Sequence, residues 1–176
     1  KFLSFSLVFI FSLRVFGQEI TVEKIWKTYE FYPKGVDGFK SMKDGEYYTK
    51  PSKELTIRKY KISDPSDKGS ILIDGTLLHY GGKQLMYDDY EFNSDETKIL
   101  FMCEVESIYR RSYSAKYYLF DMVTKKLSPL DEKHEPQTLA EYSPDGKMVS
   151  YIHGNDLFIK NVASGEVKKI TQDGKK

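Results

Sequence analysis

The feature that most constrains the fold is an internal repeat of about fifty residues. A turn-forming aspartate recurs at Asp44, Asp95 and Asp145, so the copies lie 51 and 50 residues apart. Each copy is followed by a run rich in aromatic, β-branched or other large apolar residues, which is typical of a strand. A repeat of this length cannot bury its apolar faces alone, and neighbouring copies must stack to form a core.

The last repeat shows what each copy is expected to form. Turn sequences at Ser143-Pro144-Asp145-Gly146, Gly154-Asn155-Asp156 and Ser164-Gly165 separate four short runs with strand character. These runs extend from Leu139 to Tyr142, Met148 to Ile152, Leu157 to Val162 and Val167 to Thr171. We therefore predict a four-stranded antiparallel meander, and its repetition is the signature of a β-propeller.

The length of the chain allows about three such blades. We predict an all-β fold: a partial β-propeller of about three four-stranded antiparallel blades at residues 36–176, preceded by a signal peptide at 1–17 and a lead-in segment with a short helix at 18–35. Propellers close into rings, because an open arc leaves sheet edges and blade faces uncovered. Since the first residue is Lys1 rather than Met, we expect a piece of a longer protein, without its catalytic domain.

The amino terminus has the pattern of an export signal. An apolar run from Phe2 to Leu13 is shorter than the ~20 residues of a membrane-spanning helix but suits the hydrophobic region of a signal peptide. Val15 and Gly17 then occupy the minus-three and minus-one positions of a cleavage site before Gln18. We predict export to the periplasm or out of the cell. An uncleaved membrane anchor and a buried core segment are the alternatives.

The lead-in segment contains a helical pattern. Val22, Ile25 and Trp26 lie three and four positions apart, which places them on one face of a helix. Thr21 precedes them and is a residue type that caps helix amino termini. We therefore expect a short helix here, and the helical period disappears further along the chain.

The composition excludes several classes of function. Twenty-seven basic and 26 acidic side chains leave a net charge of +1, so no overall field favours nucleic acid or an anionic membrane as partner. The single cysteine, Cys103, cannot form an internal disulfide and is interpreted as a small buried hydrophobic residue. His79, His134 and His153 lack metal-ligand spacing and are interpreted as isolated surface or turn residues. We predict no metal site and no cofactor.

The middle repeat departs from the template at one connection. Where the last repeat has Gly154-Asn155-Asp156, the middle repeat has about ten residues, from Val105 to Ser114. We predict an elongated loop, and such loops on a rigid scaffold often carry binding groups. It contains Arg110 and Arg111 between tyrosines, and guanidinium groups suit a carbonyl, carboxylate or phosphate. The alternative is a solvated hairpin tip with two ordinary surface arginines.

This segment resembles a known family. The sequence from Ile108 to Asp121 is similar to the aromatic-Arg-(His or Arg)-Ser segment in the amino-terminal propeller of dipeptidyl peptidase IV-like enzymes, within the prolyl oligopeptidase family. The run from Tyr142 to Lys147 looks like the next blade, and the runs Pro33 to Phe39 and Met42 to Tyr48 resemble bacterial members. The arginine segment is the more specific match, because aromatic-Ser-Pro-Asp-Gly is shared by many propellers.

The resemblance implies a function and a role for the arginines. In that family a carboxy-terminal α/β-hydrolase domain carries a Ser, Asp and His triad, and the propeller helps to bind the substrate. The resemblance implies that Arg110 hydrogen-bonds a backbone carbonyl near the substrate amino terminus, with Arg111 as the second candidate. The family's glutamate pair and its Gly-x-Ser-x-Gly elbow are expected beyond Lys176, so we assign no catalytic residue and expect the chain alone to be inactive.

We therefore predict part of a serine exopeptidase that releases amino-terminal dipeptides with Pro or Ala at the second position. Its partners would be peptides with a free amino terminus and its own carboxy-terminal hydrolase domain, with no nucleic acid; a homodimer is left open. The alternatives are a non-catalytic periplasmic β-propeller that binds proteins or peptides, and a related endopeptidase without the glutamate pair. A serine elbow after Lys176 would favour an enzyme, and further blades followed by a stop would favour the binder.

Overall fold

The computed structural model describes residues 19–33, 35 and 38–175. The predicted signal peptide lies outside the described residues. The chain divides into two compact units, Lys1–Gly35 and Val36–Lys176. Among the described residues, no helix combines the length and the apolar character that crossing a membrane requires.

The described part of the first unit contains one α-helix, α1 (Val22–Trp26). Thr21 caps it as predicted, because its side-chain oxygen accepts a hydrogen bond from the backbone N–H of Lys24 at 3.2 Å. Lys27 and Glu23 form an ion pair across one turn, with 2.8 Å between Nζ and Oε1. A helix this short gains little from propensity alone, so the cap and the ion pair supply its local support.

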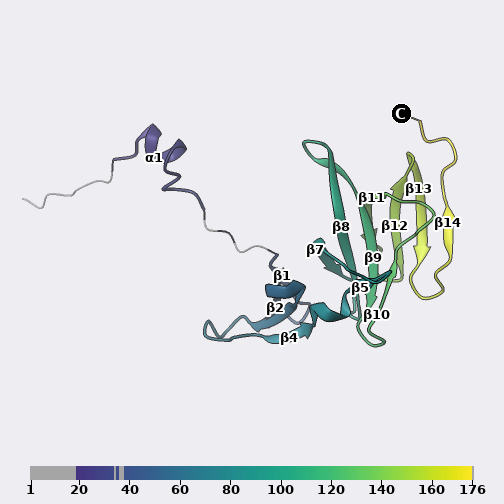
Figure 1. Ribbon diagram of the computed structural model, residues 1–176, viewed down its shortest axis with the longest axis horizontal. Coiled ribbons are helices and arrows are strands. Elements are labelled where there is room, and N and C mark those ends of the chain that lie inside the picture. The colour runs from purple at the N-terminus through teal and green to yellow at the C-terminus, as the bar shows by residue number, and fades with distance from the viewer. Residues whose placement is uncertain (1–18, 34, 36–37, 176) are drawn as a thin grey trace, which may run out of the picture. The chain divides into compact units, whose positions relative to one another are not determined.

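The described part of the second unit contains three four-stranded antiparallel sheets that follow one another in sequence (Figure 1). The first sheet consists of β1 (Lys40–Ser41), β2 (Tyr47–Pro51), β3 (Ile57–Lys61) and β4 (Ser70–Ile73). The middle sheet consists of β7 (Tyr87–Phe92), β8 (Lys98–Tyr109), β9 (Ser112–Asp121) and β10 (Lys126–Pro129). The last sheet consists of β11 (Thr138–Tyr142), β12 (Met148–His153), β13 (Asp156–Asn161) and β14 (Val167–Lys169).

Smaller elements accompany the first sheet and its connection to the middle one. They are the 3-10 turns η1 (Lys53–Leu55) and η2 (Gly75–Leu77) and the two-stranded ribbon of β5 (His79–Tyr80) and β6 (Lys83–Gln84). In each four-stranded sheet, strands that are consecutive in sequence are hydrogen-bonded neighbours. The predicted partial β-propeller of three four-stranded blades is confirmed, and the predicted strand ends in the last blade differ from the observed ones by at most two residues.

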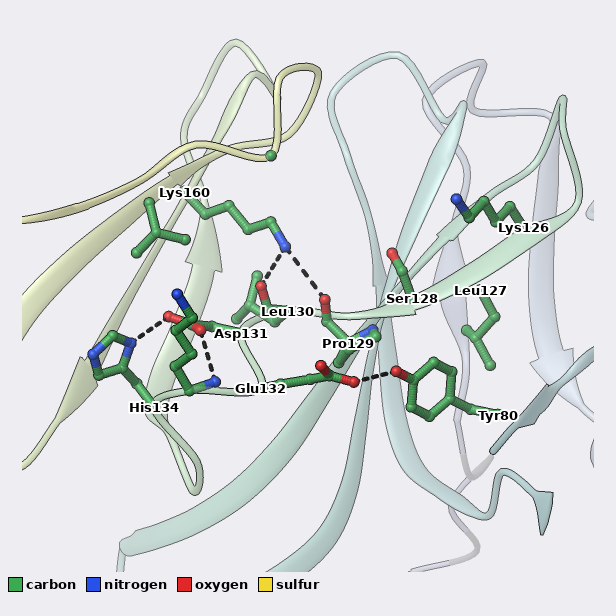
Figure 2. A pocket seen from close by; sticks show the side chains of 13 residues that line it. Tyr80, Lys126, Leu127, Ser128, Pro129, Leu130, Asp131, Glu132, His134 and Lys160 are labelled. Atoms are coloured by element: carbon green, nitrogen blue, oxygen red, sulfur yellow. Dashed lines mark hydrogen bonds and ion pairs between the residues drawn. The ribbon is translucent and has the colours of Figure 1, made fainter. Parts of the chain in front are cut away.

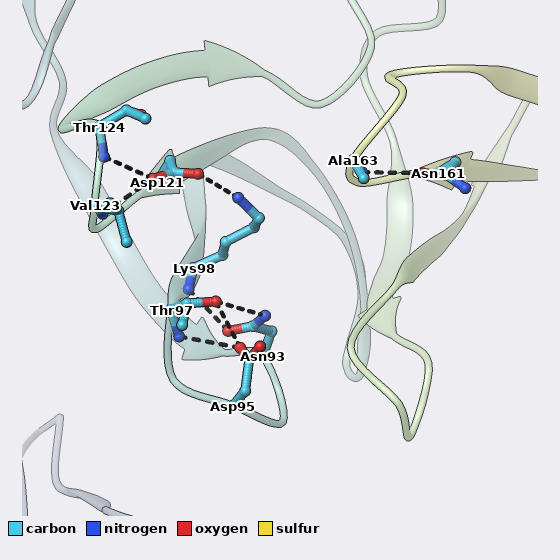
Figure 3. Close-up of polar contacts among 9 residues, drawn as sticks. All are labelled: Asn93, Asp95, Thr97, Lys98, Asp121, Val123, Thr124, Asn161 and Ala163. Atoms are coloured by element: carbon cyan, nitrogen blue, oxygen red, sulfur yellow. Dashed lines mark hydrogen bonds and ion pairs between the residues drawn. The ribbon is translucent and has the colours of Figure 1, made fainter.

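The repeated aspartates build the turns that open the second strand of each blade. Asp44, Asp95 and Asp145 each accept a hydrogen bond from the backbone N–H two residues further on, at 2.9, 3.2 and 3.1 Å. The turn before the fourth strand uses the same chemistry (Figure 3): Asp121 accepts from the N–H of Thr124 at 2.8 Å, and Asn161 accepts from two N–H groups of its own turn. The interpretation of the repeated aspartates as turn formers is confirmed.

The middle blade is buried on both faces. Ile99 and Phe101 belong to a core cluster shared with the first blade, and both are fully buried. Leu100 points to the other face and belongs to a second cluster with Val149 of the last blade. Because side chains alternate along a strand, burial on both faces requires a continuous apolar run, and β8 supplies one from Ile99 to Cys103. The core therefore lies between the blades.

Candidate functional site

The segment from Val105 to Ser114 is an extended β-hairpin and not a loop. β8 continues to Tyr109 and β9 begins at Ser112, so Arg110 and Arg111 alone connect them. Tyr109 and Ser112 face each other as the last pair of the ladder. β8 and β9 have twelve and ten residues, whereas β12 and β13 of the last blade have six each. The predicted elongated loop is therefore wrong, because strand pairing continues almost to the arginines.

Two irregularities in the pairing conceal the strands in the sequence. The register shifts between Cys103 and Glu106 and again between Ser107 and Tyr109. Each shift interrupts the alternation of inward and outward side chains, which is the main sequence signal of a strand. Glu104, at the first shift, has a φ of 50°, in the left-handed region that residues other than glycine rarely adopt.

Arg110 and Arg111 lie exposed at the end of this hairpin and are named here the arginine tip. Neither guanidinium forms a hydrogen bond or ion pair with a described residue. Ile108 and Tyr109 beside them are 60% and 83% exposed, so charged donors and apolar surface lie next to each other. This combination suits a peptide, because a planar guanidinium can orient carbonyl oxygens while the apolar surface accepts side chains.

The hairpin extends past the strands on either side of it (Figure 1, in green). β7 pairs with β8 as far as Cys103, and β10 pairs with β9 as far as Tyr118. The outer part of the hairpin, residues 104–115, is named here the ribbon. A ribbon of only two strands is marginally stable without further contacts. Lys116 and Glu104 form an ion pair at the base of the ribbon, with 2.8 Å between Nζ and Oε2. The hydrogen bond that Lys116 donates to Glu104 raises the pKa of Lys116. The arginine tip therefore stands clear of its own blade.

A second polar cluster occupies residues 130–137, which connect β10 to β11 and are named here the interblade loop. Asp131 in this loop is 8% exposed. Its carboxylate accepts hydrogen bonds from the Tyr151 hydroxyl, from His134 Nδ1 at 2.6 Å and from the backbone N–H of Lys133 at 3.0 Å. Burial alone would raise the pKa of Asp131, but these hydrogen bonds outweigh it and lower that pKa.

His134 does lie in a bend and is half-buried, as a turn residue would be, but the prediction that it is isolated is wrong. Its ring lies 4.5 Å from the ring of Phe158 and 5.5 Å from that of His153, in addition to its hydrogen bond to Asp131. The sequence offers a single hint, the spacing of three between Asp131 and His134, and that spacing is too common to single out a cluster. Tyr151, twenty residues further along, completes the network only in the folded chain.

A cleft of about 700 Å³ lies beside the interblade loop, between β10 and the last blade (Figure 2). The Lys160 ammonium reaches from β13 across it and donates hydrogen bonds to the carbonyls of Pro129, at 3.3 Å, and Leu130. Burial lowers the pKa of Lys160. Arg110 and Arg111 are not among the described residues that line this cleft, so the tip and the cluster occupy separate places.

The described residues contain no group of three or more His, Cys, Asp or Glu side chains that could hold a metal ion. Cys103 is 1% exposed, and burial raises the pKa of its thiol to about 12. The thiol therefore stays protonated and unreactive. The interpretation of Cys103 as a buried hydrophobic residue is confirmed.

Known proteins share this architecture and parts of this sequence. Residues 93–176 match the family model described as the dipeptidyl peptidase IV (DPP IV) N-terminal region. A dipeptidyl aminopeptidase of Schizosaccharomyces pombe is 35% identical over 115 residues, which are 64% of this chain and 14% of that protein. A dipeptidyl-aminopeptidase B of Ajellomyces capsulatus is 30% identical over 144 residues, which are 81% of this chain and 16% of that protein.

A solved structure extends the match to most of the chain. Dipeptidyl peptidase 4 of Porphyromonas gingivalis superposes with a TM-score of 0.72 and 29% identity, over 90% of this chain and 22% of that one. The chain thus spans 14–16% of the length of these curated relatives. The matched family region includes both arginines and the whole last blade. The chain is therefore a dipeptidyl peptidase IV-like β-propeller portion, and its residues 93–176 belong to the dipeptidyl peptidase IV N-terminal region.

Proposed function

We propose that this chain is the propeller portion of a serine exopeptidase that removes dipeptides from the amino terminus of peptides, with Pro or Ala at the second position. The observation that carries the proposal is the pair Arg110 and Arg111, unpaired with any described residue, at the tip of an extended hairpin inside the matched family region. The names of the relatives, which are dipeptidyl aminopeptidases, support the same class of reaction.

In this proposal the arginine tip orients the substrate and takes no part in proton transfer. Arg110 would donate hydrogen bonds to a backbone carbonyl near the substrate amino terminus, with Arg111 as the alternative donor. A guanidinium keeps its charge at any physiological pH and holds its donors in one plane, so it can fix a carbonyl in one orientation. A hydrolase domain, which the relatives' greater length leaves room for, would supply the nucleophile.

We also propose that the protein is exported. The apolar run from Phe2 to Leu13 and the residues Val15 and Gly17 support a cleaved signal peptide. Amino-terminal sequencing of the protein recovered from the periplasm or medium should then start at Gln18. Recovery of the intact run in the membrane fraction would contradict cleavage.

The substrate role is tested in the full-length protein. Arg110→Ala should lower kcat/KM for a chromogenic Gly-Pro substrate by about a hundredfold, because a charged hydrogen bond present in the transition state is lost. Arg111→Ala should lower kcat/KM less than Arg110→Ala does if Arg110 is the donor. A larger loss in Arg111→Ala would make Arg111 the donor. Arg110→Lys should restore only part of the rate, because the planar donors are missing.

Two controls separate this function from its rivals. Lys147→Ala removes an exposed cation from a turn of the last blade and should leave kcat/KM unchanged. Acetylation of the substrate amino terminus should abolish cleavage by an exopeptidase, whereas an endopeptidase would keep cutting. Unchanged kinetics in both arginine variants would remove the tip from the substrate site. Absence of any peptidase activity and of labelling by a serine-directed fluorophosphonate would favour a peptide-binding propeller.

A further inference from the structure

The placement of the arginine tip depends on what holds the base of its ribbon. Ala115 of β9 and Gln137 of the interblade loop exchange two backbone hydrogen bonds, each 2.9 Å long. Both residues are fully buried. Paired antiparallel bonds fix distance and direction together, so this contact sets the path of β9 at the point where the ribbon leaves its sheet. The ribbon is thus tied to a loop that leads into the neighbouring blade.

Gln137 is itself held by its side chain. Its Nε2 donates hydrogen bonds to the carbonyls of Asp131, at 2.9 Å, and His134, at 2.7 Å. Its Oε1 is buried and has no hydrogen-bond partner among the described residues, so the donors alone hold the amide. The side chain therefore closes the interblade loop on itself and fixes the backbone that meets Ala115.

The interblade loop is in turn fastened to the last blade (Figure 2). Asp131 accepts a hydrogen bond from Tyr151, which belongs to the core of β12, and its other oxygen accepts from within the loop. Lys160 of β13 holds the carbonyl of Leu130, at the start of the loop. Glu132 accepts a hydrogen bond from Tyr80 on β5. The loop is thus secured on both sides before it reaches Gln137.

We infer that Gln137 is a positioning residue for the arginine tip and that the interblade loop transmits the placement of the last blade to the β8–β9 hairpin. Gln137 is fully buried, so it would act on a substrate only indirectly, through Ala115 and the ribbon that carries Arg110. The consequence for catalysis rests on the proposed function, whereas the consequence for the hairpin does not. The two parts are therefore measured separately.

Hydrogen exchange of the full-length protein tests the hairpin directly. Gln137→Met keeps the side-chain volume and removes both Nε2 donors. Amides of the ribbon, residues 104–115, should then exchange about tenfold faster, because local opening becomes easier. Amides of β12 should exchange as before. Unchanged ribbon exchange, or an equal acceleration in β12, would overturn the inference.

Two further variants test whether the effect on the ribbon is specific to Gln137 and its anchor. Asn161→Ala also removes a side-chain amide that makes two hydrogen bonds to backbone in the last blade, but at the turn between β13 and β14. Asn161→Ala should leave hydrogen exchange of the ribbon amides unchanged. Faster exchange of these amides would show that any loosening of the last blade frees the ribbon. Tyr151→Phe removes the hydrogen bond from Tyr151 to Asp131, which holds the interblade loop but does not touch Gln137. It should speed up hydrogen exchange of the ribbon amides less than Gln137→Met does.

A kinetic double-mutant cycle tests the link to the substrate. Gln137→Met should lower kcat/KM for the Gly-Pro substrate about tenfold in the wild-type background, and less than twofold when Arg110 is already Ala. Additive effects would overturn action through Arg110. If Arg110→Ala leaves kcat/KM unchanged, the proposed substrate role fails, and the exchange measurement still decides whether Gln137 places the hairpin.

Discussion

The middle and last blades use similar turns and differ most in the connection between their second and third strands. In the last blade, Gly154 and Asn155 close a two-residue turn with φ of 56° and 70°. Such tight turns need residues that tolerate positive φ. Arg110 and Arg111 have no positive φ, and the middle hairpin reaches its turn through two register shifts.

The middle blade carries a projecting hairpin and still keeps a packed core. The buried residues that stack the middle blade on its neighbours lie between Ile99 and Cys103 on β8 and between Ala115 and Phe120 on β9. In the ribbon, Ala115 belongs to this core and the half-buried Val105 and Tyr113 pack against it, whereas residues 106–112 are exposed. Added length therefore costs the core little, and its placement depends on the interblade loop instead.

The largest expected effect tests what the two blades share. Phe120 of the middle blade and Phe158 of the last blade are 0% and 4% exposed. Phe120→Ala and Phe158→Ala should each lower the free energy of unfolding by about 3–5 kcal/mol, because each leaves a cavity. Urea denaturation measures the loss. A loss below about 1 kcal/mol in one variant would show that the blades do not share equally packed cores.

The next effect tests what the blades do not share. Replacing Ser107 to Tyr113 with Gly-Asn would let Glu106 and Ser114 flank the turn as His153 and Asp156 do in the last blade. In the full-length protein, kcat/KM should fall at least a hundredfold, while the free energy of unfolding falls by only about 1–2 kcal/mol, because the half-buried Tyr113 is lost with the exposed residues. Full activity with the short turn would mean that the projecting hairpin has no role in binding.

A smaller effect concerns the turns, where the middle blade has a charged residue and the last blade a neutral one. The hydrogen bond from Lys98, aided by the N–H of Thr124, lowers the pKa of Asp121 below its unfolded value (Figure 3). Its stabilisation is therefore present above about pH 4 and is lost as the pH falls through the folded-state pKa. Asp121→Asn, which imitates Asn161, should cost about 1 kcal/mol at pH 7.

The test is the pH dependence of that cost. Denaturation of both proteins from pH 7 to pH 2 should show the gap between them narrowing as the pH falls, because acid removes the same charge from the wild type. A gap that stays constant or widens on acidification would contradict the assignment. Asn161→Ala should show a cost that does not vary over this range, since an amide does not titrate.

The smallest effect concerns the residue after each repeated aspartate. Gly45 and Gly146 have φ of 69°, and the middle blade has Glu96 there with φ of 56°. The Glu96 carboxylate accepts a hydrogen bond from the backbone N–H of Lys43 at 2.6 Å, across to the first blade. Glu96→Gly relieves the backbone but loses that bond, so stability should change by less than about 0.5 kcal/mol.

Glu96→Ala separates these two contributions. It loses the hydrogen bond and keeps the unfavourable φ, so it should be about 1 kcal/mol less stable than Glu96→Gly. Parallel thermal denaturation of the two variants measures the difference. Equal stability of Glu96→Ala and Glu96→Gly would show that this position imposes no backbone strain on a residue other than glycine. The middle and last blades would then not differ in backbone strain at this turn.

The turns and the repeat could be read from the sequence because their causes are local. Asp145 and Gly146 make a turn with groups two residues apart, and Thr21 caps a helix with a group three residues away. The same locality placed Arg110 and Arg111 correctly between the second and third strands of the middle blade. Each of these features needs only a few consecutive residues, so pattern and propensity suffice.

Local patterns in the sequence are enough to predict the four-stranded repeat, its turns and the position of the arginines within it. The tertiary structure alone decided that the arginines stand on a paired ribbon, and that Asp131, His134 and Tyr151 form one network. The contacts that complete the network and tie the ribbon to the interblade loop join residues twenty or more apart, as in the bonds of Tyr151 to Asp131 and of Ala115 to Gln137. Local patterns carry no record of such partners, because the blades bring them together only when they stack.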